Sequence, residues 1–385
     1  MKISAIEKFL DELIECSTLD VPAWDIERIR RMNKSVYKAG WNYGDGFMVK
    51  AILEMYHITR EKRYFDFAEV FMDYRVDENG HIAGYEVEDY NIDHINAAKN
   101  LFLLYEVTGK EKYRKAMDTF YFQLTTHPRT AEGNFWHKKV YPNQIWLDGL
   151  YMGLPFYMEY ETKFNNKQNY EDIFKQYTNV VKYMRDEKTG LYFHAYDASK
   201  KAFWCDKSTG LCENFWLRAL GWYSMALLDT LEKCDPLAAG TSYEELKVVF
   251  LELIDSLLQY QDASGMWYQL PARGGEPGNY LETSGTAILS YCILKAVRLE
   301  VLKENYRKYA EKAFRGIMDR YLSVDEEGKI HLDGICLVAG LGPEGNLQRD
   351  GSYEYYISEP IVKDDTKGVA PFLLAYAELC RITEE

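Results

Sequence analysis

The chain has 385 residues and carries 60 Asp and Glu against 46 Lys and Arg, which gives a formal net charge of −14 at pH 7. This charge makes nucleic acid and anionic membranes unfavourable partners, although local cations could still hold an anionic small molecule. Seven scattered cysteines give neither a disulfide framework nor a zinc motif. There is no secretory h-region and no apolar run of membrane-spanning length, so the sequence predicts a cytoplasmic protein.

Five segments share a pattern in which an amphipathic helix opens with tyrosine and, in most copies, leads to an Asp/Gly turn and a short extended piece. The opening residues are Tyr64, Tyr113, Tyr170, Tyr243 and Tyr306. Residues 3–16 or 20–39 supply a sixth, less regular member. The charged faces of these segments predict outer, solvated helices.

Six more apolar helices alternate with the first set. They begin near Asp45, Asp93, Asp148, Phe215, Thr283 and Lys367. Their apolar character nearly all round predicts burial, and their Gly, Ala and Ser residues allow the close approach that an inner ring needs.

The alternation predicts an all-α fold, an (α/α)6 barrel in which residues 1–385 form a single domain. All inner helices would then have their N-termini at one mouth, close to the long loops 190–214, 265–282 and 329–366. An open helical solenoid shares the same periodicity and is the alternative.

The stretch 135–152, FWHKKVYPNQIWLDGLYM, places Asp148 just before an apolar helical run. A lone Asp in that position is most simply an N-cap. However, the preceding loop gathers several large rings and polar groups, which a purely structural loop rarely needs. This makes Asp148 a candidate catalytic residue.

Polar residues also mark the starts of the other inner helices. They are Asn42, Tyr43, Asp45, Asp93, His94, Glu213, Asn214, Trp216, Arg218, Trp222, Glu282, Thr283, Lys363, Asp364, Asp365 and Lys367. Each acid alone reads as a cap. Around one closed mouth, however, like charges raise the pKa of at least one carboxyl, which is how a general acid stays protonated near neutral pH.

Aromatic residues make up 15% of the chain, including 32 tyrosines. Rings suit a carbohydrate cleft, but an aromatic helical core explains most of them equally well. Trp216 and Trp222 read either as sugar-stacking rings flanking Arg218 or as two core tryptophans beside a surface arginine. His194, at the start of a long loop, reads as either a structural or a functional histidine.

Motifs for nucleotide, zinc or serine-hydrolase chemistry do not occur, and DENG near residue 77 is too short for a calcium loop. We therefore expect no metal and no cofactor.

Three motifs in combination, FWHKKVYPNQIWLDGLYM, NIDHINAAK and NFWLRALGWY, resemble the unsaturated rhamnogalacturonyl hydrolases of glycoside hydrolase family 105. The resemblance covers about residues 20–380. It implies an (α/α)6 barrel without a metal, acting on rhamnogalacturonan fragments left by pectin lyases. The expected reaction removes the 4,5-unsaturated galacturonosyl residue.

The resemblance also assigns roles. Asp148 would be the proton donor and water activator, and Asp93 its acidic partner, which favours the protonated form of Asp148 by like-charge repulsion. The positions that match substrate contacts are Trp41, Tyr43, His137, Lys138, His194, Trp216, Arg218 and Trp222. Residues of the loops 265–282 and 329–366 have no assigned match.

The expected mechanism is hydration of a vinyl ether by Asp148. His137, Lys138 and Arg218 are the nearby cations for the substrate carboxylate, with Arg218 the first choice and Lys138 the second. Three alternatives stay open: an unsaturated glucuronyl hydrolase acting on glycosaminoglycan disaccharides, an inverting glycosidase on saturated sugars, and a sugar-binding protein without activity.

Overall fold

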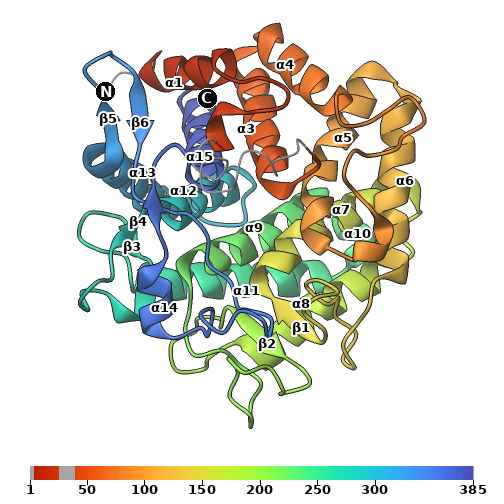
Figure 1. Ribbon diagram of the computed structural model, residues 1–385, viewed down its shortest axis with the longest axis vertical. Coiled ribbons are helices and arrows are strands. Elements are labelled where there is room, and N and C mark those ends of the chain that lie inside the picture. The colour runs from red at the N-terminus through yellow and green to blue at the C-terminus, as the bar shows by residue number, and fades with distance from the viewer. Residues whose placement is uncertain (1–3, 26–39, 385) are drawn as a thin grey trace.

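The computed structural model describes residues 4–25 and 40–384, and these form two concentric layers of helices (Figure 1). The inner helices are α3 (Tyr43–Thr59), α5 (Ile95–Thr108), α7 (Leu147–Phe164), α9 (Leu217–Lys233), α12 (Thr283–Arg298) and α15 (Thr366–Glu384). Each packs against the next, and α15 packs against α3. This contact closes the ring, so the predicted (α/α)6 barrel is confirmed and the open solenoid is excluded.

The outer helices are α1 (Ser4–Glu15), α4 (Lys62–Asp73), α6 (Glu111–Thr126), α8 (Tyr170–Met184), α11 (Thr241–Leu258) and α13 (Arg307–Tyr321). Figure 1 shows α1, α4, α6 and α13 along the outer edge. A short helix, α10 (Pro236–Ala239), precedes α11, and single 3-10 turns are η1 (Ala23–Asp25), η2 (Val87–Asp89), η3 (Ile92–His94), η4 (Pro271–Arg273) and η5 (Glu304–Tyr306).

In three of the five copies the repeated tyrosine has a structural role, because its hydroxyl bonds to the preceding outer helix. The Tyr113 hydroxyl donates to Asp73 of α4, and the Tyr306 hydroxyl donates to Asp255 of α11. Tyr64 of α4 makes the same kind of bond to Asp11 of α1, at 3.0 Å. This places α1 as the sixth outer helix. The alternative sixth member, residues 20–39, lies largely outside the described residues.

Small residues allow the inner helices to pack closely, as expected. A Cβ atom on Gly46 of α3 would lie 2.3 Å from the Cα of Ala97 in α5. One on Gly285 of α12 would lie 2.4 Å from the Leu217 side chain of α9. A larger residue at either glycine would therefore push neighbouring helices apart.

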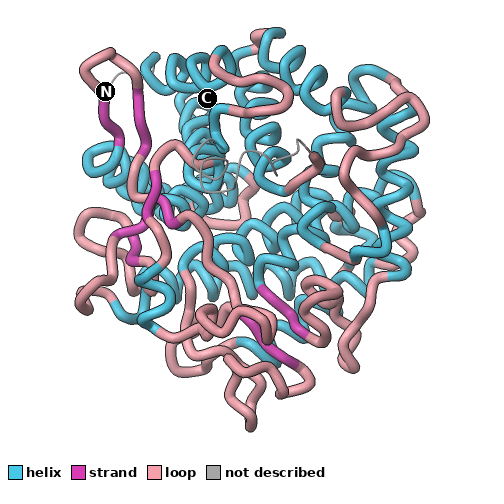
Figure 2. The backbone as a smooth tube through the Cα atoms, in the orientation of Figure 1, coloured by secondary structure: helices cyan, strands magenta, loops and turns pink. Residues whose placement is uncertain are grey.

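The strands are short antiparallel pairs confined to the loops (Figure 2). The pairs are β1 (Gln144–Trp146) with β2 (Ala195–Asp197), β3 (Trp267–Tyr268) with β4 (Leu281–Glu282), β5 (Leu322–Val324) with β6 (Ile330–Leu332), and β7 (Ile335–Cys336) with β8 (Ile361–Val362). A last short helix, α14 (Tyr353–Ser358), lies between β7 and β8 in sequence. Of these pairs, only β1 and β2 join two different connections, the one before α7 and the one after α8, whereas each of the other pairs lies within a single connection.

Within the described ranges, no helix combines the length and the apolar character that crossing a bilayer requires.

Candidate active site

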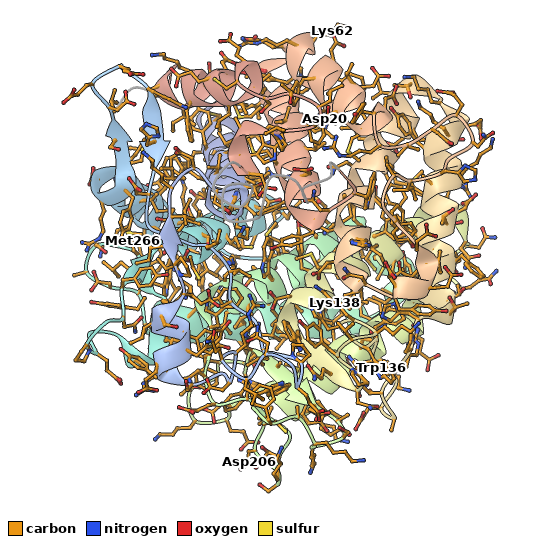
Figure 3. The ribbon with its side chains drawn as sticks, viewed as in Figure 1. Asp20, Lys62, Trp136, Lys138, Asp206 and Met266 are labelled. Carbon is orange, nitrogen blue, oxygen red and sulfur yellow. The ribbon has the colours of Figure 1, made fainter. Side chains whose placement is uncertain are left out.

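A cavity of about 120 Å³ opens where the N-terminal ends of the inner helices converge. Its lining comes from α3, η3, the loop before β1, β1 itself, α7, the N-cap and first turns of α9, and the loop after β7. The lining residues are Tyr43, Asp93, His137, Lys138, Tyr141, Trp146, Asp148, Met152, Trp216, Arg218, Trp222, Val338, Ala339, Gly340 and Arg349. In Figure 3, Lys138 lies toward the centre of the ring, whereas Asp206 lies at the tip of a loop on the lower edge.

Asp148 is the second residue of α7, so it lies in the first turn, where the helix dipole favours negative charge. It is not the N-cap, because that position belongs to Trp146, which makes no side-chain capping bond. Instead, Asp148 Oδ2 lies 3.1 Å from His194 Nε2. The side chain is 14% exposed and lines the cavity. The carboxyl is thus oriented by an imidazole and remains open to a ligand.

Asp93 belongs to η3, and its carboxylate is paired with a lysine. Asp93 Oδ2 lies 2.6 Å from Lys138 Nζ, and Oδ1 lies 3.6 Å from His137 Nε2. Burial opposes ionisation of Asp93, but the charge of Lys138 and the hydrogen bond from it outweigh burial and lower the pKa of Asp93. The pKa of Lys138 is shifted upward. Burial opposes the charge of Lys138, but Asp93 outweighs burial and raises this pKa. The two side chains form an ion pair at neutral pH.

His137, one of the three candidate cations, carries no charge at neutral pH. Burial lowers the pKa of His137 to about 4 and outweighs the attraction of Asp93, so the imidazole is neutral at pH 7. Its ring stacks on Trp146 at 4.4 Å, and Trp146 in turn stacks on Tyr141 at 4.8 Å. His137 is therefore part of an aromatic wall of the cavity.

Trp216, Arg218 and Trp222 all line the cavity, which favours their interpretation as site residues. The Arg218 guanidinium lies 4.7 Å from the Trp216 ring centroid. Arg218 is only 1% exposed, so the surface-arginine alternative is wrong. Its Nη1 donates to Ser284 Oγ at 3.0 Å and to the carbonyl of Cys336, which fixes the β7 segment beside the cavity.

Trp41 and Tyr43 are neighbours in sequence, but the structure separates them. Tyr43 lines the cavity. Trp41 is buried beside it, donates from Nε1 to the carbonyl of His94 at 2.6 Å, and stacks on Phe120 at 5.2 Å. Trp41 therefore supports the wall from behind and is not among the lining residues.

The acids at the other helix starts have structural partners instead. Asp45 lies 3.2 Å from an Arg75 nitrogen, and Asp365 pairs with Lys367 at 2.7 Å. Glu282 caps α12 by accepting from the backbone N–H groups of Ser284 and Gly285. Of the acids expected at the mouth, Asp93 and Asp148 are the two that line the cavity.

His194 is completely buried and does not line the cavity itself. It links Asp148 to Tyr356 of α14, because His194 Nδ1 lies 2.7 Å from the Tyr356 hydroxyl. Arg349 reaches the cavity from the loop between β7 and α14, close to Gly340 and Trp146. The sequence showed only that this long loop is rich in aromatic and polar residues, so Tyr356 and Arg349 were not identified from it.

Known proteins resemble this chain in sequence and in fold. The family described as Glycosyl Hydrolase Family 88 matches residues 23–383. The chain is similar to a solved structure of a family 105 glycoside hydrolase from C. acetobutylicum ATCC 824, with 42% identity, a TM-score of 0.86, and coverage of 96% of this chain and 98% of that one.

Two curated relatives have lower identity or coverage. Protein Atu3128 of Agrobacterium fabrum is 37% identical over 59% of this chain and 97% of its own length. The unsaturated rhamnogalacturonyl hydrolase YesR of Bacillus subtilis is 24% identical over 75% of this chain and 78% of its own length.

Proposed function

Because the chain belongs to glycoside hydrolase family 105, we propose that it removes the 4,5-unsaturated galacturonosyl residue from the non-reducing end of rhamnogalacturonan oligosaccharides. The three sequence motifs and the name of the Bacillus subtilis relative support this substrate. The observation that carries the proposal is the arrangement of two carboxylates in one aromatic cavity. Asp148 contacts an imidazole, whereas Asp93 is paired with a lysine.

The proposed reaction hydrates the double bond between C4 and C5 of the unsaturated sugar. Asp148 gives its proton to C4, and the ring oxygen stabilises the cation that forms at C5. Water adds to C5 and returns a proton to the same carboxylate. The bond from C5 to the ring oxygen then breaks, which gives a ketone at C5 and a hemiacetal at C1. The hemiacetal collapses to an aldehyde and releases the remaining sugar as an alcohol.

Asp148 is the better general acid of the two carboxyls. Lys138 stabilises the ionised form of Asp93, and a carboxylate held ionised in this way is a poor proton donor. Asp148 has no lysine or arginine within ion-pair distance among the described residues, and it lines the cavity. One carboxyl therefore serves as acid and then as base, while Asp93 supplies a fixed negative charge beside it.

The negative charge of the substrate requires a cation in the cavity. Lys138 already pairs with Asp93, and Arg218 already binds Ser284 and the Cys336 carbonyl. Arg218 still has further N–H donors, and its planar fork suits a carboxylate. Arg349 lines the same cavity, and its side chain has no hydrogen bond or ion pair with any described residue. We propose that Arg218 contacts the uronate carboxylate directly and that Arg349 contributes attraction at the rim.

The experiment that tests this function is incubation with lyase-digested rhamnogalacturonan, followed by the ultraviolet absorbance of the unsaturated ring. Loss of the absorbance with release of a rhamnose-terminated product is expected. Faster turnover of an unsaturated glucuronyl disaccharide from glycosaminoglycan would change the substrate assignment. Activity restricted to saturated analogues would point to an inverting glycosidase, which needs a second carboxylate roughly 6.5–9.5 Å away. Binding without turnover of any fragment would contradict the enzyme assignment.

We also propose a cytoplasmic location. The cysteines of the described residues form no disulfide, which fits a reducing compartment. Fractionation of cells producing the protein tests this, and recovery outside the cytoplasm would contradict it.

A further inference from the structure

A buried hydrogen-bonded chain reaches from the cavity into the loop region between β7 and β8. It runs from Asp148 Oδ2 to His194 Nε2 at 3.1 Å, and from His194 Nδ1 to the Tyr356 hydroxyl at 2.7 Å. Tyr356 and His194 are both completely buried, so water does not compete for the bond between them, whereas Asp148 at the cavity end of the chain is 14% exposed. The positions of the protons along this hydrogen-bonded chain therefore depend on Asp148, His194 and Tyr356 themselves.

The Tyr356 hydroxyl has one hydrogen to donate and, among the described residues, one acceptor within reach. Donation to His194 Nδ1 satisfies this hydrogen, and a ring that accepts at Nδ1 carries its proton on Nε2. In the opposite tautomer, Nδ1–H would donate to the tyrosine oxygen, and the hydroxyl hydrogen would be buried without an acceptor. A buried, unsatisfied donor is costly, so the contact favours the Nε2–H tautomer.

This tautomer makes the two oxygens of Asp148 different. Nε2–H donates to Oδ2, whether the carboxyl is protonated on Oδ1 or ionised. Oδ1 is then the oxygen that gives the proton to the substrate and later receives one from water. We propose that Tyr356 is a positioning residue that holds His194 as the Nε2–H tautomer and thereby reserves Asp148 Oδ1 for proton transfer. Its importance for turnover rests on the proposed function of Asp148.

The position of Tyr356 is itself well fixed. Its carbonyl accepts from Gln269 Nε2 at 3.3 Å, and Gln269 Oε1 accepts from Trp216 Nε1 at 3.1 Å. Ser352 caps α14 by accepting from the backbone N–H of Tyr355 at 3.2 Å. The same network thus joins Tyr356 to the aromatic wall of the cavity.

The surroundings keep the hydroxyl in its neutral form. Burial raises the pKa of Tyr356 well above its usual value. The other ionisable groups that influence it, besides Asp148, are Cys212, Tyr355 and Cys336. Burial raises the pKa of each cysteine to about 11 and also raises the pKa of Tyr355, so all three are uncharged at pH 7. The hydroxyl is therefore available as a donor throughout the neutral range.

The first test is Tyr356→Phe, which removes the hydroxyl and keeps the ring. We expect kcat on the unsaturated disaccharide to fall roughly 10-fold to 100-fold with KM little changed, by analogy with the loss seen when the hydrogen-bond partner of a metal-ligating histidine is removed. The control is Tyr353→Phe on the same short helix, where the hydroxyl donates to the Pro277 carbonyl at 2.9 Å, away from the cavity. A Tyr356→Phe enzyme with wild-type kcat and an unchanged pH profile would overturn the proposal.

The second test does not depend on activity. Nitrogen NMR of protein labelled at histidine reports which ring nitrogen of His194 carries the proton, with His194→Gln used to assign its signals. The wild-type protein should show protonated Nε2 and unprotonated Nδ1, and Tyr356→Phe should show a mixture. The opposite tautomer in the wild type would refute the proposal, even if the substrate assignment were correct. If instead the tautomer is as expected but no unsaturated uronide is turned over, the failure lies in the proposed function.

A double-mutant cycle separates this role from a merely structural one. If Tyr356 acts through His194, Tyr356→Phe should have little further effect on kcat in a His194→Gln background. Additive losses of kcat would show that Tyr356 does not act through the imidazole and would contradict the proposal.

Discussion

The two ends of the inner ring both gather charge, but they use it differently. Near the C-terminal ends of α9 and α12, Asp229 lies 2.6 Å from Lys295 Nζ and 3.4 Å from Lys50 Nζ. Lys295 also lies 2.8 Å from Glu232. At the mouth, Asp148 meets only the His194 imidazole among the described residues. A buried charge that loses its partner destabilises the fold, so the charged groups near the C-terminal ends of α9 and α12 depend on one another, whereas a carboxyl left without a cation stays available for proton transfer.

At the end of the ring opposite the cavity, which we call the base, the charged groups continue as a network across the contact between α15 and α3. Glu378 of α15 lies 2.7 Å from an Arg298 nitrogen and 2.8 Å from an Arg381 nitrogen, and Arg381 also pairs with Glu54 of α3. Burial opposes the charge of Glu54, but Lys50 and Arg381 outweigh it and lower its pKa to about 2. The first and last inner helices, α3 and α15, are thus joined by side chains that remain ionised throughout the neutral pH range.

The strongest test of this contrast at the mouth is Asp148→Asn, which keeps the shape and removes the proton. We expect kcat/KM on the unsaturated disaccharide to fall about 10²-fold to 10⁴-fold, the usual contribution of a general acid–base group. Thermal unfolding should change little, because the side chain makes one hydrogen bond and lines a cavity. A near-wild-type rate of loss of the ultraviolet absorbance would refute the assignment of Asp148.

The matched variant at the base is Asp229→Asn. Removing one partner of a buried ion pair leaves Lys295 and Lys50 without their shared carboxylate, which costs about 3–5 kcal/mol of the free energy of unfolding. At a temperature where the variant is folded, kcat should be close to that of the wild type. A large loss of kcat without a loss of stability would mean that the two ends are not separate in function.

Acid titration sharpens the same comparison. Burial opposes ionisation of Asp229, but Lys295, Lys50 and Lys99 outweigh it and lower the pKa of Asp229 below the usual 3.8. A lowered pKa gives stabilisation that is present above the unfolded value and lost as the pH falls toward the folded one. The difference in unfolding free energy between wild type and Asp229→Asn should therefore be constant from pH 7 to about 5 and shrink below about pH 4.

The ring of helices was predictable because its signals are local and repeated. Apolar periodicity and the opening tyrosines, such as Tyr113, recur along the chain, and both features depend on residues close in sequence. Asp93 and Asp148 were found for the same reason, since Asp93 lies just before an inner helix and Asp148 lies in the first turn of one. Asp229 and Lys295 were not singled out, although isolated charges within such apolar helices indicate buried pairing.

The rest of the site depends on contacts between distant segments. Tyr356 lies 162 residues beyond His194 in the chain, on the segment between β7 and β8, two strands that pair with each other and that Arg218 binds at the Cys336 carbonyl. No periodic pattern encodes those contacts. Trp41 is the opposite case. Its position in the sequence suggested that it lines the cavity, but its ring packs on Phe120. A sequence gives the position of a side chain along a helix or loop but not the direction in which a loop residue points.

The cations at the mouth are the next test. Arg218→Lys keeps the charge but removes the planar fork, and disrupting a buried, charged hydrogen-bonded pair costs about 2–5 kcal/mol in kcat/KM. Arg349→Gln at the rim should cost less, about 1.5–3 kcal/mol for a hydrogen bond to a charged group. The readout is kcat/KM on the unsaturated disaccharide and on its uronate methyl ester. If a residue contacts the carboxylate, its substitution should lower kcat/KM much more on the free uronate than on the methyl ester. An equal loss of kcat/KM on both substrates would exclude that role.

Lys138→Ala belongs in the same series as the second choice for the carboxylate. A near-wild-type Arg218→Lys beside a strongly impaired Lys138→Ala would transfer the role to Lys138. Unfolding temperatures of all three variants show whether a loss of activity reflects the site or the packing of the β7 segment, which Arg218 also holds.

The smallest expected effect concerns the pair beside Asp148. Asp93→Asn removes a negative charge and leaves Lys138 without its partner at 2.6 Å. The remaining positive charge favours an ionised carboxylate nearby, so the basic limb of the kcat/KM pH profile should move to lower pH by about one unit.

Lys138→Met breaks the same pair by removing the lysine and leaves Asp93 as the uncompensated charge, so the basic limb of this variant should move to higher pH. Both variants lose the same ion pair, which makes each the structural control for the other. Opposite shifts would show that Asp93 and Lys138 act on the reacting group by charge. Shifts in the same direction, or none, would mean that the pair only holds η3 against the loop before β1.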